Sequence, residues 1–449
     1  MFTYKDAQDY LEKAKKKGSV LGLETMQALM QELGEPQNQI PTVHIAGTNG
    51  KGSVGAYLAS ICKEAGFKVG RFCSPAVFHP LECWQYDGER ITEEAYAKAM
   101  EMVKRACENA SLEPTAFELE TALAFVYFEE MKPDVLLLEV GMGGAEDATN
   151  VIEHPIATVF TKISRDHMQF LGESLSEIAE KKAGIMKKGS FAFWGKQEPE
   201  VEAVLKAECE ARGAVRGDVY TRCIEFLSQE PGKLCFSYLG VEYQTQMSGL
   251  YQMQNATLAI AVFDAIWQRL LFGLEPDEIN EDEIPIMCIL DMEYACKLGV
   301  AKAQWKGRFE VISREPLFII DGAHNEDAVK QLAFTIENSF TNPRLNLIIG
   351  ILADKEHEKM LEPMMPFANR VFTITPPNPR GLSGAVLAEE IRPMHKEVMF
   401  CETIKEALDR ALASSEQDGC PVLAFGSLSY LGELEETYKQ ICESRIEDV

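Results

Sequence analysis

The sequence has no apolar run long enough to cross a membrane and no N-terminal segment of the signal-peptide kind. Its longest apolar stretches, at residues 135–138 and 347–352, have only the length of strands. The first 18 residues follow a helical rhythm without an apolar core. These absences argue against a membrane-spanning or secreted protein. We expect the protein in the cytoplasm, without membrane contact.

Closely spaced cysteine pairs are also missing. The twelve cysteines are scattered at irregular spacing, and none forms a CxxC pair. A chain of 449 residues does not need disulfides to hold its core, so we expect reduced, mostly buried thiols.

Positive charge is scarce. Lysine and arginine number 44 against 70 aspartates and glutamates, a net charge of −26. Such a field repels nucleic acid unless a basic patch offsets it, and the short run at residues 15–17 fits a solvated helix face. We therefore expect small-molecule substrates and no nucleic-acid partner. An anionic ligand must be held locally, by loop amides, a few basic side chains and metal ions.

The chain is long enough for two or three domains, and its first part alternates between short apolar runs and helical patterns. A strand at residues 41–46 leads into a helix at 51–65, and a helix at 117–131 precedes a strand at 134–140. A strand at 158–163 is followed by a helix at 174–186. This order predicts an α/β fold with a mostly parallel sheet and helices on both faces.

An acidic segment at residues 273–286, GLEPDEINEDEIPI, interrupts this alternation and indicates a loop or insertion. Afterwards the alternation restarts, which predicts a second, smaller, Rossmann-like α/β domain. We divide the chain into domains at residues 1–297 and 298–449. The expected strands of the second domain are 317–320, 345–351, 371–375 and 422–425, with helices at 325–337 and 385–391.

The strongest motif is VHIAGTNGKGS at residues 43–53. A strand, a turn of small residues and a helix follow one another, so backbone N–H groups can converge on phosphate oxygens. Lys51 would neutralise a terminal phosphate, and the Ser53 hydroxyl would reach Mg²⁺. The standard phosphate-loop pattern fails twice, because position 45 is Ile and Gly52 separates Lys51 from Ser53. A plain Gly-rich turn is the alternative.

The segment DVLLLEVGMGGAEDATN, residues 134–150, places a carboxylate at the end of an apolar strand. Open α/β sheets bind ligands at this edge, and Mg²⁺ prefers hard oxygen ligands, so Glu139 is a candidate ligand for the ion. The Gly-rich loop that follows contains Asp147. A strand-end glutamate that simply faces solvent is the alternative.

Two further segments carry candidate residues that are ambiguous on their own. His167 follows a strand and could ligate a metal, although a lone His is more often structural. Lys182 near a helix C-terminus could be a dipole partner only. Arg308 suits nucleotide phosphates, and Asp321 in the turn before His324 suits a ribose hydroxyl. A strand–turn–helix connection capped by Asp321 or Asn325 is the competing interpretation.

Taken together and in this order, these segments resemble the folylpolyglutamate synthase and dihydrofolate synthase family, part of the Mur-type ATP-dependent amide ligases. The resemblance runs from about residue 20 to 435. Its most specific pieces are GTNGKGS, EVGMGGAEDATN, DHMQFLGESLSEIAEKKAGI, WKGRFEV, IDGAHN, PPNPRG and FGSLSYLGE.

The resemblance implies roles for matching residues. Two Mg²⁺ ions would be bound by Ser53 and Glu139 and by His167, and Lys182 matches a lysine that is carbamylated in this family. The catalytic residues implied are Lys51, His167, Lys182 and His324. The ATP-binding residues implied are Thr48, Asn49, Gly50, Lys51, Gly52, Ser53, Asn255, Arg308 and Asp321. On the substrate side they are Ser74, Pro75 and Asp147.

The implied reaction belongs to folate biosynthesis and one-carbon metabolism. ATP phosphorylates a carboxylate to an acyl phosphate, and the amine of L-glutamate attacks the acyl carbon. Folate or dihydropteroate would supply the carboxylate, and we expect the enzyme to be a monomer.

The sequence departs from the family pattern on the substrate side. Ala76-Val77 replaces His-Leu, Cys83 and Ala145 each stand in place of Arg, and Tyr251 stands where His is frequent. Two alternatives therefore remain: a Mur-like ligase for a non-folate carboxylate, and a nucleotide-binding regulatory module without ligase activity. Retention of five ATP-side residues argues against the second. They are Glu139, His167, Lys182, Asp321 and His324.

Overall fold

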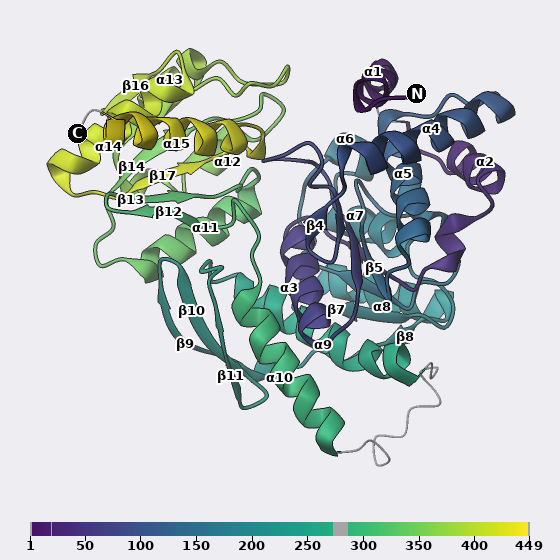
Figure 1. The fold of residues 1–449 in the computed structure, drawn as a ribbon. Coiled ribbons are helices and arrows are strands. Elements are labelled where there is room, and N and C mark those ends of the chain that lie inside the picture. Colours follow the sequence, from purple (N-terminus) through teal and green to yellow (C-terminus); the bar gives the residue numbers. More distant parts are fainter. Residues whose placement is uncertain (1, 19, 273–285, 448–449) are drawn as a thin grey trace.

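The computed structural model describes residues 2–18, 20–272 and 286–447. These residues contain three β-sheets (Figure 1). The first sheet has eight strands in the order β4-β3-β2-β5-β1-β6-β7-β8. Its strands are parallel from β2 to β8, and β3 and β4 are added antiparallel at one edge. Their bounds are β1 Thr42–Ala46, β2 Val69–Phe72, β3 Trp84–Tyr86, β4 Glu89–Arg90, β5 Val135–Glu139, β6 Ala157–Phe160, β7 Phe191–Trp194 and β8 Val215–Arg216.

Helices cover both faces of this sheet, and the alternation along β5 shows how. Val135 and Leu137 belong to one apolar core, and Leu136 and Leu138 belong to the other. A parallel strand covered on both faces is apolar throughout, which explains the run VLLLE. The helices are α1 Tyr4–Lys15, α2 Glu24–Glu32, α3 Lys51–Glu64, α4 Glu93–Ala110, α5 Ala116–Met131, α6 Met168–Leu171, α7 Leu175–Ala183, α8 Pro199–Arg212, α9 Gln252–Phe272 and α10 Ile286–Lys302.

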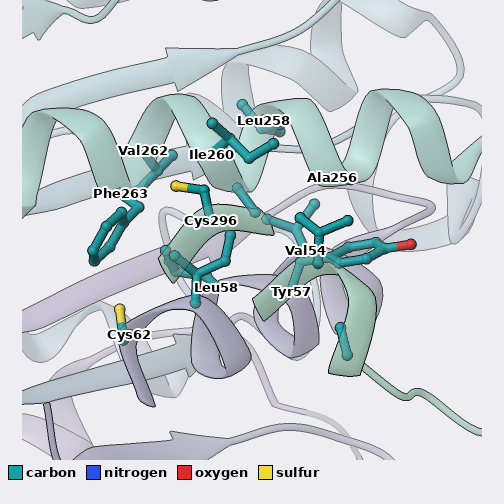
Figure 2. Packing of buried hydrophobic residues seen from close by; sticks show 14 of the residues in the cluster. Val54, Tyr57, Leu58, Cys62, Ala256, Leu258, Ile260, Val262, Phe263 and Cys296 are labelled. Carbon is teal, nitrogen blue, oxygen red and sulfur yellow. The ribbon is translucent and has the colours of Figure 1, made fainter. Parts of the chain in front are cut away.

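Helices α3, α9 and α10 pack together on one face, as Figure 2 shows. Tyr57 and Leu58 of α3 lie against Ala256 and Phe263 of α9, with Cys296 of α10 beside them. All of these side chains are buried. Apolar packing against α9 and α10 therefore holds α3, and with it the position of Lys51 at its N-terminus.

A three-stranded antiparallel sheet, absent from the sequence-based expectation, projects beside α10 (Figure 1). Its strands are joined by two-residue turns. Pro231 precedes Gly232 at φ 83°, and Leu239 and Gly240 both have positive φ, at 52° and 81°. The Leu239–Gly240 turn, with positive φ at both residues, matches the twist of paired strands, whereas Pro231–Gly232 has positive φ only at the glycine, as in a type II turn. The strands are β9 Ile224–Glu230, β10 Lys233–Tyr238 and β11 Val241–Thr245.

The third sheet, of six strands, forms the C-terminal part in the order β12-β13-β17-β14-β15-β16. All neighbours are parallel except β12 on β13. Separate apolar cores lie on its two faces. Its elements are β12 Glu310–Arg314, β13 Leu317–Ile320, α11 Glu326–Ser339, β14 Leu345–Ile349, α12 His357–Leu361, β15 Ala368–Thr373, α13 Gly384–Ile391, β16 Val398–Phe400, α14 Ile404–Asp418, β17 Val422–Phe425 and α15 Leu431–Glu447.

The predicted α/β class with two parallel-rich sheets is confirmed. The strands predicted at 317–320 and 422–425 coincide with β13 and β17. The predicted loop at residues 273–286 lies outside the described residues except for Ile286, where α10 begins. The division at residues 297 and 298 falls within α10 and stays a prediction. Below, residues up to 302 are called the N-terminal unit and those from 307 onward the C-terminal unit.

The eleven cysteines whose side chains the structure describes are free, and seven of them are buried. In the described ranges, no helix is both long and apolar enough to cross a membrane.

Candidate functional site

The loop between β1 and α3 has the backbone of a phosphate-binding turn. Gly47 and Gly50 have φ of 150° and 96°, which disfavour residues with a side chain. A Cβ at Gly47 would lie 1.8 Å from Thr161 Oγ1, and one at Gly50 would lie 2.6 Å from Asn255 Oδ1. The N–H groups of Thr48 and Asn49 donate to Lys162 O, at 2.9 and 3.1 Å. These two hydrogen bonds therefore fix the loop to the backbone at Lys162.

The start of α3 is the part of this loop open to an anion. No side chain in the described part of the protein caps the helix at Gly50, so the N–H groups of its first turn lack that partner. The side chain of Ser53, the third residue of the helix, is buried and accepts a hydrogen bond from Gln252 Nε2 at 3.2 Å. Asn255 Nδ2 donates to Gln252 Oε1 at 2.9 Å, so predicted residues Ser53 and Asn255 are linked through Gln252.

Lys51, Lys182 and Glu139 converge beside this helix start. Lys51 Nζ and Lys182 Nζ both donate to Gly47 O, at 3.2 and 2.9 Å. Glu139, the last residue of β5, has Oε1 3.9 Å from Lys51 Nζ. Two lysines predicted from separate motifs therefore share one backbone carbonyl, and the Glu139 carboxylate lies beside Lys51.

Burial controls the charge of this group. It raises the pKa of Glu139, against which Lys51, Arg71 and Arg308 act. Burial, together with repulsion from Lys51, lowers the pKa of Lys182 to about 7. The carboxylate of Glu139 is buried, and the side chains of Lys51 and Lys182 lie close enough to repel each other. This arrangement favours the binding of a charged ligand that offsets the buried charges.

Asp166 joins the two units. Its Oδ1 lies 2.6 Å from Lys355 Nζ, and its Oδ2 lies 3.8 Å from His324 Nε2. Burial alone would raise the pKa of Asp166, but Lys355 and His324 hold it below its ordinary value. Burial lowers the pKa of His324 to about 4, so its imidazole is neutral at pH 7. His167, which follows Asp166 in the sequence, has a left-handed backbone with φ 51°, and burial lowers its pKa.

A second link runs through Asp321, which follows β13. Its Oδ2 accepts from Tyr251 Oη at 2.8 Å and from Phe309 N at 2.7 Å, and its Oδ1 accepts from Ala323 N at 2.8 Å. Burial raises the pKa of Asp321, and the neighbouring Arg308 opposes this. The carboxylate predicted to bind a ribose thus has partners within the protein.

The phosphate loop also contacts the C-terminal unit directly. Asn49 Nδ2 donates to Asn325 Oδ1 at 3.2 Å and to Asp327 Oδ2 at 2.9 Å, and Asn325 Nδ2 returns a bond to Asn49 Oδ1 at 3.0 Å. The first turn of α11 therefore lies against the turn that precedes α3.

The predicted substrate-side residues are Ser74, Pro75 and Asp147, and the charge of Asp147 acts on Lys182 of this group. Ser74 is half-buried and Pro75 is exposed, in a loop that Glu82 closes. The Glu82 carboxylate accepts from the N–H groups of Val77 and Phe78 at 2.5 and 3.0 Å, and from that of His79 at 3.2 Å.

Asp147 holds its own loop in a similar way. Its carboxylate accepts from Met142 N at 2.7 Å, from Thr149 N at 3.1 Å and from Thr149 Oγ1 at 2.5 Å. Burial raises its pKa. The structure therefore gives Asp147 a full set of partners within residues 142–149.

Sequence reasoning missed several residues that shape the site. Lys355 follows β14 at the carboxyl edge of the second parallel sheet, a position that could have suggested it. Gln252 and Tyr251 contact site residues from the start of α9. Their contacts with Ser53 and Asp321 join residues that are distant in the sequence, and nothing local indicates them.

The donor set suits a magnesium–nucleotide complex better than a metal held by protein alone. The described residues contain no cluster of three or more His, Cys, Asp or Glu side chains that could hold a metal ion. Mg²⁺ is usually bound by one or two carboxylates together with phosphate oxygens and water. Glu139 and Ser53 beside a helix start fit that pattern.

Comparisons with known proteins agree with this geometry. Residues 45–263 match the family described as the Mur ligase middle domain, and residues 307–428 match the family described as the Mur ligase, glutamate ligase domain. The dihydrofolate synthase/folylpolyglutamate synthase of Bacillus subtilis is 32% identical over 98% of this chain and 100% of its own length. The folylpolyglutamate synthase of Lacticaseibacillus casei is 31% identical, over 91% of this chain and 92% of its own.

Solved structures show the same fold. Mycobacterium tuberculosis folylpolyglutamate synthase, complexed with ADP and AMPPCP, superposes with a TM-score of 0.81 at 28% identity, over 97% of this chain and 99% of that chain. E. coli FolC with DHPP and ADP superposes with a TM-score of 0.80 at 26% identity, over 99% and 98%. The chain therefore belongs to the folylpolyglutamate synthase and dihydrofolate synthase family of Mur-type ligases.

Proposed function

We propose that this protein is an ATP-dependent ligase that joins L-glutamate to a folate-type carboxylate through an acyl phosphate. The observation that carries the proposal is that Lys51 and Lys182 converge on Gly47 O, with Glu139 beside Lys51, at an uncapped helix start. His324 and Lys355 of the C-terminal unit lie beside it through Asp166. The named relatives, and a solved complex of a related synthase with AMPPCP and folate, support the choice of substrates.

The reaction has two steps. A carboxylate oxygen of the folate or dihydropteroate attacks the γ-phosphorus of ATP, and ADP leaves. The amine of L-glutamate then attacks the acyl carbon, loses a proton, and inorganic phosphate leaves as the amide forms. Lys51 and the N–H groups of α3 offset negative charge on the transferred phosphoryl group. His324 Nδ1 donates to Gly322 O at 2.7 Å, so Nε2 of the neutral ring would serve as a hydrogen-bond acceptor near that group.

Two Mg²⁺ ions are part of the proposal. Ser53 and Glu139 would hold one and His167 the other. Bound Mg²⁺ would neutralise phosphate charge and align the γ-phosphoryl group. The ion pair of the buried Glu139 with Lys51 spans 3.9 Å, longer than a hydrogen bond, so the carboxylate has room for a metal ligand role.

Lys182 fits carbamylation. With its pKa lowered to about 7, a large fraction of its amine is neutral at physiological pH. That amine can attack carbon dioxide: an N–C bond forms, one proton is released, and the product is a carboxylate. We propose that the carbamate replaces a crowded cation with an oxygen ligand.

The remaining parts of the proposal concern the nucleotide, the substrate loop and the setting. Asn255, Arg308 and Asp321 would contact the nucleotide, and Ser74, Pro75 and Asp147 would shape the folate side. The chain would divide into domains near residue 297 and act as a cytoplasmic monomer on small molecules.

A second candidate is ligation of glutamate to a carboxylate other than a folate. The exposed Ala76, the buried Cys83 and the half-buried Ala145 favour it, because each stands where the family has a larger polar side chain. A regulatory nucleotide-binding module is the third reading, and it requires no acyl acceptor at all.

The deciding experiment supplies the purified protein with ATP, Mg²⁺, L-glutamate and either dihydropteroate or tetrahydrofolate. Release of phosphate, together with a product heavier by one glutamate residue, supports the proposal. Phosphate release with other carboxylates but with neither pterin would support the second candidate. ADP binding without turnover on any carboxylate would support the regulatory module. The Lys51→Ala variant controls for contaminating ATPases.

A further inference from the structure

Gly52 is the position where the phosphate loop departs from the standard pattern, and the structure gives a steric reason for glycine there. A Cβ on Gly52 would lie 2.5 Å from Trp305 Nε1 and 2.8 and 3.0 Å from two carbons of the same ring. No real Cβ comes so close to a neighbour. The indole of Trp305 therefore rests directly on the first turn of α3, which would bind the nucleotide phosphates in the proposed function.

Arg71 of β2 completes this contact. Its guanidinium carbon lies 3.9 Å from the centroid of the Trp305 ring, and its Nη2 donates to Gly52 O at 2.6 Å. Gly55 gives it space, since a Cβ there would lie 3.3 Å from Arg71 Nε. Only 5% of the Arg71 side chain surface is exposed. A cation stacked on an aromatic ring and shielded from water is a strong contact.

Trp305 lies in the connection between the two units. It follows α10, which packs on α3, and precedes β12 of the C-terminal unit. Its neighbour Lys306 pairs with Glu435 of α15 at 2.8 Å and lies over the ring of Phe78. The position of the indole therefore depends on how the two units are arranged.

We infer that Arg71 and Trp305 are positioning residues for ATP: stacked together, they hold the first turn of α3 and tie its placement to the connection between the units. This indole clamp, formed by Gly52, Arg71 and Trp305, touches no reacting atom. This inference depends on the proposed function only for the identity of the reaction, because nucleotide binding can be measured without ligation. The charge of Arg71 also acts on Glu139, where it opposes the rise in pKa caused by burial.

The test compares Arg71→Ala, Trp305→Leu and Gly52→Ala with the unmodified protein. We expect the Kd for Mg·ADP and the KM for ATP to rise roughly tenfold or more in each, because a charged hydrogen bond or a stacked cation is lost or displaced. The KM for glutamate should stay within about twofold. Arg71→Lys should restore part of the affinity, since it keeps the charge but not the planar stack.

The chain offers a matched control in a second stacked pair. Arg216 lies 4.8 Å from the ring centroid of Trp194, on strands β8 and β7 away from α3. Arg216→Ala should leave Mg·ADP affinity unchanged. If Arg216→Ala weakens Mg·ADP binding as much as Arg71→Ala does, the loss of affinity comes from general destabilisation, and the positioning role of Arg71 and Trp305 is refuted.

Chemical rescue separates positioning from folding. Arg71 lines a cavity of about 220 Å³ together with Lys63, Gln85 and Lys302, so the space vacated in Arg71→Ala opens into it. Low-millimolar guanidinium should restore Mg·ADP affinity to Arg71→Ala and have no effect on Trp305→Leu. Folded variants that bind Mg·ADP like the unmodified protein would overturn the inference. Loss of affinity in a protein that ligates no pterin would leave the clamp standing and overturn the folate assignment.

Discussion

The acidic groups of the phosphate site and of the substrate-side loops differ in how many hydrogen-bond partners the protein gives them. Glu139 meets Lys51 only at 3.9 Å, and α3 starts without a side-chain cap. By contrast, Glu82 accepts three backbone N–H groups, and Asp147 accepts two N–H groups and one hydroxyl. Polar groups left with room suit ligand binding, and polar groups with full partners build the loop itself. An acidic side chain is therefore available to a ligand at the phosphate site, whereas in the substrate-side loops it stabilises the loop.

The largest expected effect comes from Glu139. Glu139→Gln should lower the ligation rate roughly 10²- to 10³-fold, because the ligand for the proposed Mg²⁺ loses its charge. Thermal stability should not fall, since burial already penalises the charged carboxylate. Steady-state kinetics and a melting curve check both parts. A variant that melts much earlier would mean that Glu139 is structural, as Asp147 is.

Glu82 should show the reverse behaviour. Glu82→Gln should lower the free energy of unfolding by about 2 kcal/mol, because charge-assisted hydrogen bonds to the loop are weakened. The Kd for Mg·ADP should not change. Urea unfolding and calorimetric titration measure the two quantities. Glu108→Gln, which breaks a surface pair with Lys104 on α4, serves as the control and should cost less than about 1 kcal/mol.

Lys182 predicts a pH dependence. Its pKa is about 7 when folded and near 10.5 when unfolded, so between these values the unfolded chain binds one more proton. Stability must therefore rise with pH in this window. Between pH 7.5 and 9, in bicarbonate-free buffer, the gain relative to Lys182→Met should be about 2 kcal/mol. Parallel urea titrations check this, and equal slopes for both proteins would contradict it.

The smallest expected effect tests the contact of the phosphate loop with α11. Asp327→Ala removes the acceptor of one Asn49 hydrogen bond, while Asn325 keeps the other. A loss of about 1 kcal/mol corresponds to a rise of roughly fivefold in the KM for ATP. Asp409→Ala on α14, which removes only an exposed pair with Lys405, should leave the KM unchanged.

Local patterns were sufficient for the elements that carry the phosphate site. Residues 42–64 form the predicted strand, turn and helix, because the apolar strand, the glycines and the helix are all decided within about 20 residues. The hairpin sheet at residues 224–245 was missed. Its edge strand β9 is mostly exposed, so it shows little of the apolar alternation that identifies a strand.

Contacts between distant residues could not be predicted. Arg71 and Trp305 are far apart in the chain, and neither position looks special by itself. Lys355 meets Asp166 across 189 positions. The fold brings these pairs together, so their roles become visible only once both sheets are placed.

Val77 and Phe78 have a consequence for how the two units separate. Both belong to a loop of the N-terminal unit, yet they pack against the apolar core formed by Phe318, Tyr430 and Leu434 of the C-terminal unit. Any opening between the units exposes this surface to water, and so must increase the heat capacity of the protein. Because apolar attraction weakens on cooling, the population of open molecules should grow at low temperature. The substrate loop thus makes the separation of the two units sensitive to temperature.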